Sequence, residues 1–216
     1  MARDPVRILL VDDHSVFTDA MASALADEAD LEIVAVAGTG EAGIESYTDD
    51  VDVVLCDFRL PDIDGIEVVT RILARDPDAK VVMLSASTDE GVLVAAVEAG
   101  CAGFVSKTAS LSEVAAAVRA ASMGEAVVSP ALLARLLPRL ARSGGPGADE
   151  LTPRELEVLR AMAAGGTNRE IGEALFIAHD TVRNHVASLS QKLGAHSKLE
   201  AVAVAVRRGI ITLDGD

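Results

Sequence analysis

Short hydrophobic runs alternate with longer segments of helical periodicity along the first 124 residues of the chain. The hydrophobic runs predict five strands, at residues 6–11, 31–37, 51–56, 80–84 and 103–105. The first, third and fourth are almost continuously apolar, which is typical of strands covered by helices on both faces. The segments between them predict helices, the last of which opens with a Ser110 and Glu113 capping box. This alternation predicts an α/β domain with a doubly wound, five-stranded parallel sheet.

A second pattern, of closely spaced helix starts, begins near residue 151. Thr152 and Thr167 each precede a glutamate by three residues, so both predict capping boxes at helix starts. A third helix is expected from about residue 180 to Gly194, and a fourth from its cap at Ser197 to just before Gly209. These signals predict a small all-α domain of four helices.

Turn-forming residues and charge divide the chain into the same two parts. The run Ser-Gly-Gly-Pro-Gly at residues 143–147 has no apolar anchor, so we expect domains at residues 1–124 and 149–216 joined by a linker at residues 125–148. Of the net charge of −15, residues 1–125 contribute 24 acidic and 8 basic side chains, whereas residues 149–216 are nearly balanced, with 10 and 8. Any contact with nucleic acid should therefore come from the second domain.

Composition excludes several classes of protein. Half of the residues are hydrophobic, which argues against disorder, and the longest stretch without a charged side chain, residues 126–134, is far shorter than the roughly 20 residues that cross a bilayer. The first residues lead directly into a strand without a secretory leader pattern, so a cytoplasmic location and no membrane partner are expected. Cys56 and Cys101 lie in no metal-binding motif and are expected to be reduced packing residues.

Polar side chains stand at the carboxyl ends of four predicted strands. They are Asp12 and Asp13 after the first strand, Asp57 after the third, Ser85 after the fourth and Lys107 after the fifth. These ends meet at one edge of a parallel sheet, where ligands bind in such folds. Grouped carboxylates repel one another unless a cation neutralises them, and oxygen ligands suit Mg²⁺. Lys107 and Ser85 would then contact the oxygens of an incoming phosphoryl group, with Asp57 as the nucleophile.

Each of these residues also has an ordinary structural interpretation. Asp12 and Asp13 precede a helix and could simply cap it, Ser85 alone is more often a turn residue, and Lys107 alone is most often a solvated charge. Their joint placement on one rim favours a site, because independent structural roles do not require it.

With these residues in view, residues 6–124 resemble the receiver domain of two-component response regulators, a flavodoxin-like fold. The resemblance rests on the acidic pair, Asp57, Ser85 and Lys107, and on Phe104 three residues before the lysine. It implies that Asp57 accepts a phosphoryl group from a sensor histidine kinase. It also implies that Asp12, Asp13, Asp57 and the Arg59 backbone carbonyl hold Mg²⁺, that Lys107 pairs with the phosphoryl group, and that Ser85 and Phe104 form the switch pair.

The third helix of the second domain has one apolar and one polar face. Its polar face offers short, amide and guanidinium side chains, namely Arg183, Asn184, Ala187, Ser188 and Gln191. Such a face fits a major groove, where arginine bonds guanine and asparagine bonds adenine, although a solvated helix face explains it equally well. Lys192 and Lys198, taken alone, are expected to be solvated charges.

The order of blocks from residue 151 to about 211 resembles the LuxR-type helix-turn-helix. The matched positions imply that Arg183, Asn184 and Ala187 face the bases, while Thr181 and Lys192 approach phosphates. Ser188 is a further expected DNA contact. Two positions depart from the family pattern. Ala178 replaces the usual Ser, which removes a hydroxyl cap, and Gly172 replaces the usual Ala, so we expect the third helix to be held less firmly.

Together the two resemblances indicate the NarL/FixJ family of response regulators. They imply a transcription factor rather than an enzyme, with a histidine kinase, double-stranded promoter DNA and a second copy of the chain as partners, and RNA polymerase as a further candidate. Three alternatives stay open: an aspartyl-phosphate hydrolase, a ligand-sensing LuxR-type regulator, for which one Tyr, four Phe and no Trp are poor pocket material, and a family member that does not use Asp57.

Overall fold

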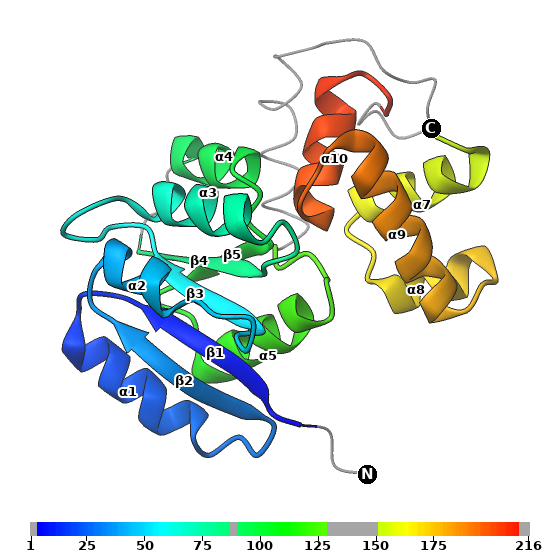
Figure 1. Ribbon diagram of the computed structural model, residues 1–216. Helices are drawn as coiled ribbons and strands as arrows, with labels where there is room; N and C mark the ends of the chain where they lie inside the picture. The colour runs from blue at the N-terminus through cyan, green and yellow to red at the C-terminus, as the bar shows by residue number, and fades with distance from the viewer. Residues whose placement is uncertain (1–3, 87–89, 129–150, 212–216) are drawn as a thin grey trace.

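A five-stranded parallel sheet forms the N-terminal domain of the computed structural model, which describes residues 4–86, 90–128 and 151–211 (Figure 1). The strands run in the order β2-β1-β3-β4-β5. Their bounds are Val6–Val11 (β1), Leu31–Ala37 (β2), Val53–Asp57 (β3), Val81–Ser85 (β4) and Gly103–Ser106 (β5). The expected fold class is confirmed. The third and fourth strands each begin and end one or two residues later than predicted, so that Asp57 and Ser85 are the last residues of β3 and β4.

Helices cover both faces of this sheet. They are Ser15–Leu25 (α1), Gly40–Ser46 (α2), Gly65–Arg75 (α3), Glu90–Glu98 (α4) and Leu111–Ser122 (α5). Alternate β1 residues point to opposite faces: Leu9 belongs to the core beneath α2, α3 and α4, whereas Ile8 belongs to the core beneath α1 and α5. Burial on both faces explains why β1, β3 and β4 are apolar at nearly every position.

The first domain extends beyond residue 124, where we expected the linker to begin. Val127 lies beside β5, because its N–H donates to the Ala102 carbonyl at 3.0 Å and its carbonyl accepts from the Phe104 N–H at 2.7 Å. A Cβ at Gly103 would lie 2.2 Å from the Val127 carbonyl oxygen, so this close approach requires glycine. Val127, which we expected in the linker, therefore packs on the first domain. The turn-forming run at residues 143–147 lies outside the described residues.

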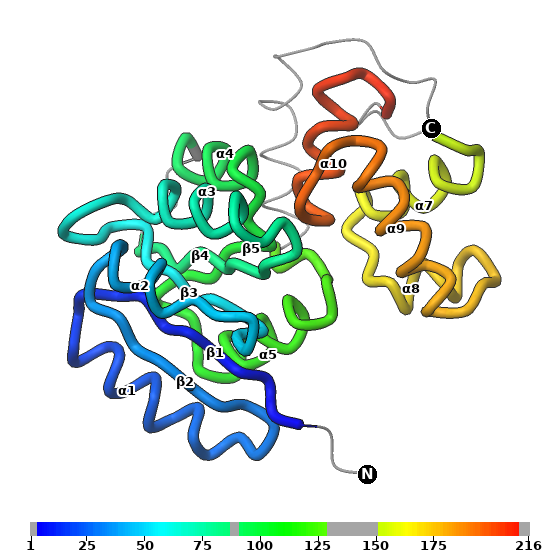
Figure 2. The backbone as a smooth tube through the Cα atoms, viewed as in Figure 1, coloured from blue at the N-terminus to red at the C-terminus, as the bar shows by residue number. Residues whose placement is uncertain are grey.

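Four helices make up the described part of the C-terminal domain. They are Pro153–Ala163 (α7), Asn168–Leu175 (α8), His179–Leu193 (α9) and Lys198–Arg207 (α10). Capping boxes at Thr152 and Thr167 start α7 and α8 as predicted, and Ser197 caps α10. The α10 helix packs between its own domain and α4, and the tube in Figure 2 shows how α10 brings the two domains together.

Candidate functional site

The carboxyl ends of β1, β3, β4 and β5 meet at one rim of the sheet. There β3 ends at Asp57 beside Leu84, and β4 ends at Ser85 beside Ser106. The rim lies where the strand order reverses around β1, since β2 flanks β1 on one side and β3 flanks it on the other. This reversal opens the crevice in which doubly wound sheets bind ligands.

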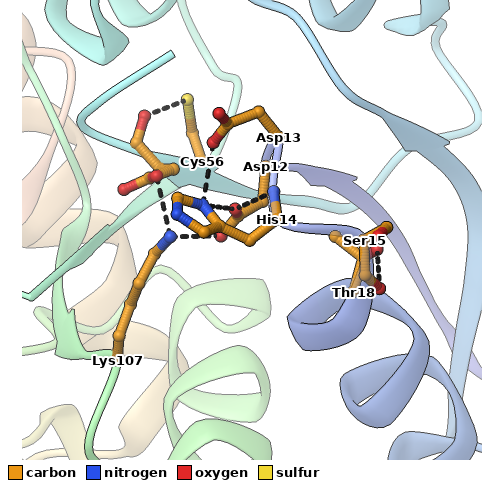
Figure 3. Close-up of polar contacts among 8 residues, drawn as sticks. Asp12, Asp13, His14, Ser15, Thr18, Cys56 and Lys107 are labelled. Atoms are coloured by element: carbon orange, nitrogen blue, oxygen red, sulfur yellow. Dashed lines mark hydrogen bonds and ion pairs between the residues drawn. The ribbon is translucent and has the colours of Figure 1, made fainter.

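Lys107 joins two of the predicted acids across this rim. Its Nζ lies 2.6 Å from Asp12 Oδ2 (Figure 3). The same Nζ lies 2.7 Å from Asp57 Oδ2. Both carboxylates are nearly fully buried, and the lysine side chain is 14% exposed. Burial by itself lowers the pKa of Lys107, but its bonds to Asp12 and Asp57 outweigh this effect and raise the pKa above its usual value. Lys107 therefore stays protonated and positively charged between the two carboxylates.

His14 is the residue of this site that sequence reasoning missed. Its Nδ1 lies 3.1 Å from Asp12 Oδ1 and 2.8 Å from Asp13 Oδ1, so the ring lies over the acidic pair (Figure 3). Its place directly after Asp12-Asp13 was the only signal available, and a ring nitrogen next to two acids can serve as a ligand or a proton carrier.

The acidic cluster fits a divalent cation. Asp12, Asp13, His14 and Asp57 each offer one ligand atom, and these atoms all lie within 4.8 Å of one another. Three of the four are carboxylate oxygens, the donors that hard divalent cations take, and the imidazole nitrogen is the departure from an all-oxygen set. Arg59, whose carbonyl is the further expected ligand, lies in the loop that follows β3, two residues after Asp57.

Ser85 and Phe104, the predicted switch pair, lie on the neighbouring strands β4 and β5. Ser85 is 6% exposed at the end of β4, and its carbonyl accepts from the Lys107 N–H at 3.0 Å. Phe104 is 9% exposed on β5, opposite Met83, and belongs to the core beneath α3 and α4. The backbone bond from Lys107 to Ser85 ties the loop after β5 to the end of β4.

The α9 helix presents part of the predicted DNA-reading face. Arg183, Asn184 and Ala187 are exposed on one side of the helix and Thr181 is half-buried, while Val182 and Leu189 are buried on the other side. As expected, the N-cap residue Ala178 makes no side-chain capping bond. This exposed side carries a guanidinium and an amide, which are side-chain groups that can bond base edges in a major groove.

Models of two families match the chain. The response regulator receiver domain matches residues 8–119, and the luxR family of bacterial regulatory proteins matches residues 149–205. The transcriptional regulatory protein LiaR of Bacillus subtilis is 34% identical over 209 residues, covering 95% of this chain and 99% of LiaR.

This chain belongs to the NarL/FixJ family of response regulators.

Two further proteins are similar to this chain over almost its whole length and support the same family. The transcriptional regulatory protein DegU of Brevibacillus brevis is 31% identical over 222 residues, covering 94% of each chain. The crystal structure of the response regulator ChrA, from a heme-sensing two-component system, is 31% identical with a TM-score of 0.53, covering 97% of this chain and 100% of ChrA. The protein is thus a two-component response regulator with a receiver and a LuxR-type DNA-binding domain that regulates transcription. Among the helices that the structure describes, none is long and apolar enough to cross a membrane.

Two of the predicted DNA contacts, Ser188 and Lys192, bond within the DNA-binding domain. Ser188 Oγ donates to Glu155 Oε1 at 2.6 Å, and Lys192 Nζ lies 2.9 and 2.7 Å from the two oxygens of the same carboxylate. Glu155 is buried on α7, so both side chains turn toward α7. They differ from Arg183 and Asn184 in this respect, because their polar groups stabilise the domain internally.

The expectation of a solvated Lys198 is wrong. Its side chain is only 4% exposed and pairs with Glu125 of the receiver. Cys56 and Cys101 are free and buried, as expected. Burial raises the pKa of both thiols, which keeps them protonated and unreactive.

Proposed function

We propose that a sensor histidine kinase phosphorylates Asp57 and that this event controls dimerisation and sequence-specific promoter binding. The observation that carries the proposal is the placement of one ammonium, from Lys107, against the carboxylates of Asp12 and Asp57 at the sheet rim. In the reaction an Asp57 oxygen attacks the phosphorus, the P–N bond to the kinase histidine breaks, and the new P–O bond makes an acyl phosphate.

Asp12, Asp13, Asp57 and the Arg59 carbonyl would hold Mg²⁺ at this rim. When bound, the ion supplies positive charge that neutralises the oxygens of the transferring phosphoryl group. The chain's own residues set up the rest of the reaction. Asp57 sits at the end of a buried strand, which fixes its direction of attack, and Lys107 supplies a cation on the same side.

Phosphorylation changes what Lys107 must neutralise. The acyl phosphate has about two negative charges on three oxygens, so the lysine is drawn from its bridge between Asp12 and Asp57 toward the new group. The backbone bond between Lys107 and Ser85 passes this movement to the end of β4. The Ser85 hydroxyl and the Phe104 ring then adjust, and they alter the face formed by α4 and β5.

Dimerisation gives the DNA-binding domain the affinity that a monomer lacks. Residues 149–216 have 8 basic and 10 acidic side chains, so general attraction to DNA is weak. Two recognition helices held together bind paired half-sites one helical turn or a multiple apart, through the effective concentration of the second helix. In this arrangement Arg183 and Asn184 read base edges, Ala187 lies against them, and Thr181 approaches the backbone.

Acetyl phosphate and Mg²⁺ provide a direct test of the acceptor. The wild-type chain should gain one phosphoryl group by intact-protein mass spectrometry, Asp57→Asn should gain none, and the exposed α1 variant Asp19→Asn should behave as wild type. A phosphorylated Asp57→Asn would refute the assignment. Sedimentation velocity before and after phosphorylation tests the dimer, which an unchanged molecular mass would exclude.

A selected duplex tests the reading face. After selection of a binding sequence from a random pool, Arg183→Ala should lose about 1–3 kcal/mol of binding free energy, the amount carried by a bidentate arginine contact with guanine. Arg160→Ala removes the same charge from the exposed side of α7 and serves as the matched control. Equal losses of binding free energy in the two variants would show that Arg183 acts only through its charge and does not read a base.

A further inference from the structure

A carboxylate of the receiver is buried in the DNA-binding domain. Glu125 follows α5 and is 8% exposed. Its Oε1 accepts from the backbone N–H of Asn168 at 2.9 Å, and its Oε2 lies 2.8 Å from Lys198 Nζ. Asn168 is the first residue of α8, so the carboxylate of one domain binds the N-terminus of a helix in the other.

The residues around this carboxylate form a site for an anion. Lys198 is buried, and its ammonium also donates to the Gly166 carbonyl at 2.9 Å and to Asn168 Oδ1 at 3.2 Å, both of which are neutral. Among the described residues, Glu125 is its only ion-pair partner. The start of α8 adds the Asn168 N–H and a partial positive charge at the same point. When the domains separate, Lys198 therefore loses its ion-pair partner and the Asn168 N–H is left unpaired, while the Glu170 carboxylate stays bonded to Thr167 at the same helix start.

This site faces the same space as the recognition helix. A cleft of about 1090 Å³ between the domains is lined by Glu125, Asn168 and Lys198 together with Arg183 and Asn184 of α9. A cleft of this volume suits a small molecule and is too small for a duplex. A duplex lying on α9 must therefore displace the receiver, and it would bring its phosphates toward the residues that Glu125 now occupies.

We propose that Lys198 and the α8 N-terminus form a DNA phosphate site that the Glu125 carboxylate fills, as a phosphate mimic, when the domains are docked. The proposal rests on the proposed function, since it adds a backbone contact and a competitor to the same DNA-binding domain. In helix-turn-helix proteins the first helix of the motif crosses the DNA backbone, and helix N-termini bind phosphates. Carboxylate and phosphate compete for one N–H and one ammonium, so domain docking and DNA binding exclude each other.

The arrangement also connects to the receiver rim. Glu125 stands at the far end of α5 from the loop that holds Lys107, and Ser197 Oγ of the α10 cap donates to the Cys101 carbonyl, just before β5, at 2.9 Å. Glu125 follows α5, and Lys198 is the first residue of α10, whose cap contacts the segment before β5. Movement of β5 and α5 on phosphorylation thus acts on both partners of the ion pair between the domains.

The test measures binding of the full unphosphorylated chain to duplex DNA of random sequence over a range of salt concentrations. Glu125→Gln keeps the size of the side chain and removes its charge, and should bind at least tenfold more tightly than wild type. In the Glu125→Gln background, Lys198→Gln should make the negative slope of log K against log salt shallower by about 0.9, the value of one phosphate contact. Arg160→Gln in the same background is the matched control and should change the slope less. Circular dichroism checks that each variant is folded. The double variant of Glu125 and Lys198 removes both charges of the pair, so neither is left buried without its partner.

The outcomes separate this inference from the function on which it rests. If Glu125→Gln binds DNA no more tightly than wild type, Glu125 does not compete with DNA. If Lys198→Gln leaves the salt slope unchanged, Lys198 does not contact a phosphate. In both cases DNA binding itself persists. If neither the phosphorylated wild type nor any variant binds duplex DNA, the proposed function fails first. Tighter binding of Glu125→Gln together with the shallower salt slope of Lys198→Gln supports the inference.

Discussion

Replacement of Glu155 by Gln should destabilise the DNA-binding domain without touching its DNA-reading face. The Glu155 carboxylate is 4% exposed and accepts from the Thr152 N–H and hydroxyl, from Ser188 and from Lys192. Burial alone would raise the pKa of Glu155, but the bonds from Lys192, Ser188 and Thr152 lower it from 4.5 to about 2. Gln fills the same space, so the change removes charge and leaves no cavity.

The expected loss follows from these contacts. A pKa lowered from 4.5 to about 2 is worth at most about 3 kcal/mol. Lys192 is 33% exposed, so solvent screens its pair with Glu155 and the expected loss falls to about 2 kcal/mol. For a domain of this size, that loss lowers the melting temperature by about 10 °C.

The assay must report one domain at a time. The chain has no Trp, and its single tyrosine, Tyr47, lies in the receiver, so its fluorescence follows only that domain. Hydrogen exchange of the α7 and α9 amides should become about 25-fold faster in Glu155→Gln, because 1.4 kcal/mol corresponds to a factor of ten. Glu157→Gln, on the same helix but in an exposed pair with Arg154, should change exchange less than threefold.

The pH dependence gives a second criterion. The folded pKa of Glu155 lies below its unfolded value, so its stabilisation is complete above about pH 4.5 and is lost as the pH falls toward 2. In urea unfolding followed by far-ultraviolet circular dichroism, wild type and Glu155→Gln should therefore differ fully at pH 7 and by less than half as much at pH 3. A difference that stays constant over this range, or a loss no larger than that of Glu157→Gln, would refute the reasoning.

Three further predictions concern single positions. Ala178→Ser should add the missing cap of α9 and stabilise the DNA-binding domain by about 1 kcal/mol in urea unfolding, and a loss of stability would contradict this. Gly172→Ala should destabilise the same domain by about 1–3 kcal/mol despite the helix propensity of Ala, because the new Cβ would lie 2.8 Å from the Ile177 carbonyl oxygen; a gain would show that the turn yields easily. Alkaline spectrophotometric titration should show a raised pKa for Tyr47, whose burial and bond to Asp76 at 2.6 Å both favour the neutral phenol; Asp76→Asn should lower that pKa, and a pKa near 10 in the wild type would exclude the bond.

Local sequence determined which elements form and where the rim residues stand. Strand patterns and capping residues depend on neighbours a few positions apart, so the five strands and the caps at Ser110, Thr152 and Thr167 were predictable. The convergence of Asp12 and Asp57 with Lys107 also followed, because parallel strands with crossover helices bring their carboxyl ends to one edge.

Only the tertiary structure decided which charges become buried pairs. Lys192 and Lys198 look alike in the sequence, yet one turns to Glu155 of its own domain and the other to Glu125 of the receiver. The second pair spans 73 residues and depends on how two separate domains dock, which no local pattern encodes. The place of His14 above the acids likewise depends on side-chain packing at the rim. Periodicity specifies the face of an element, whereas the partner of a side chain depends on every element packed around it.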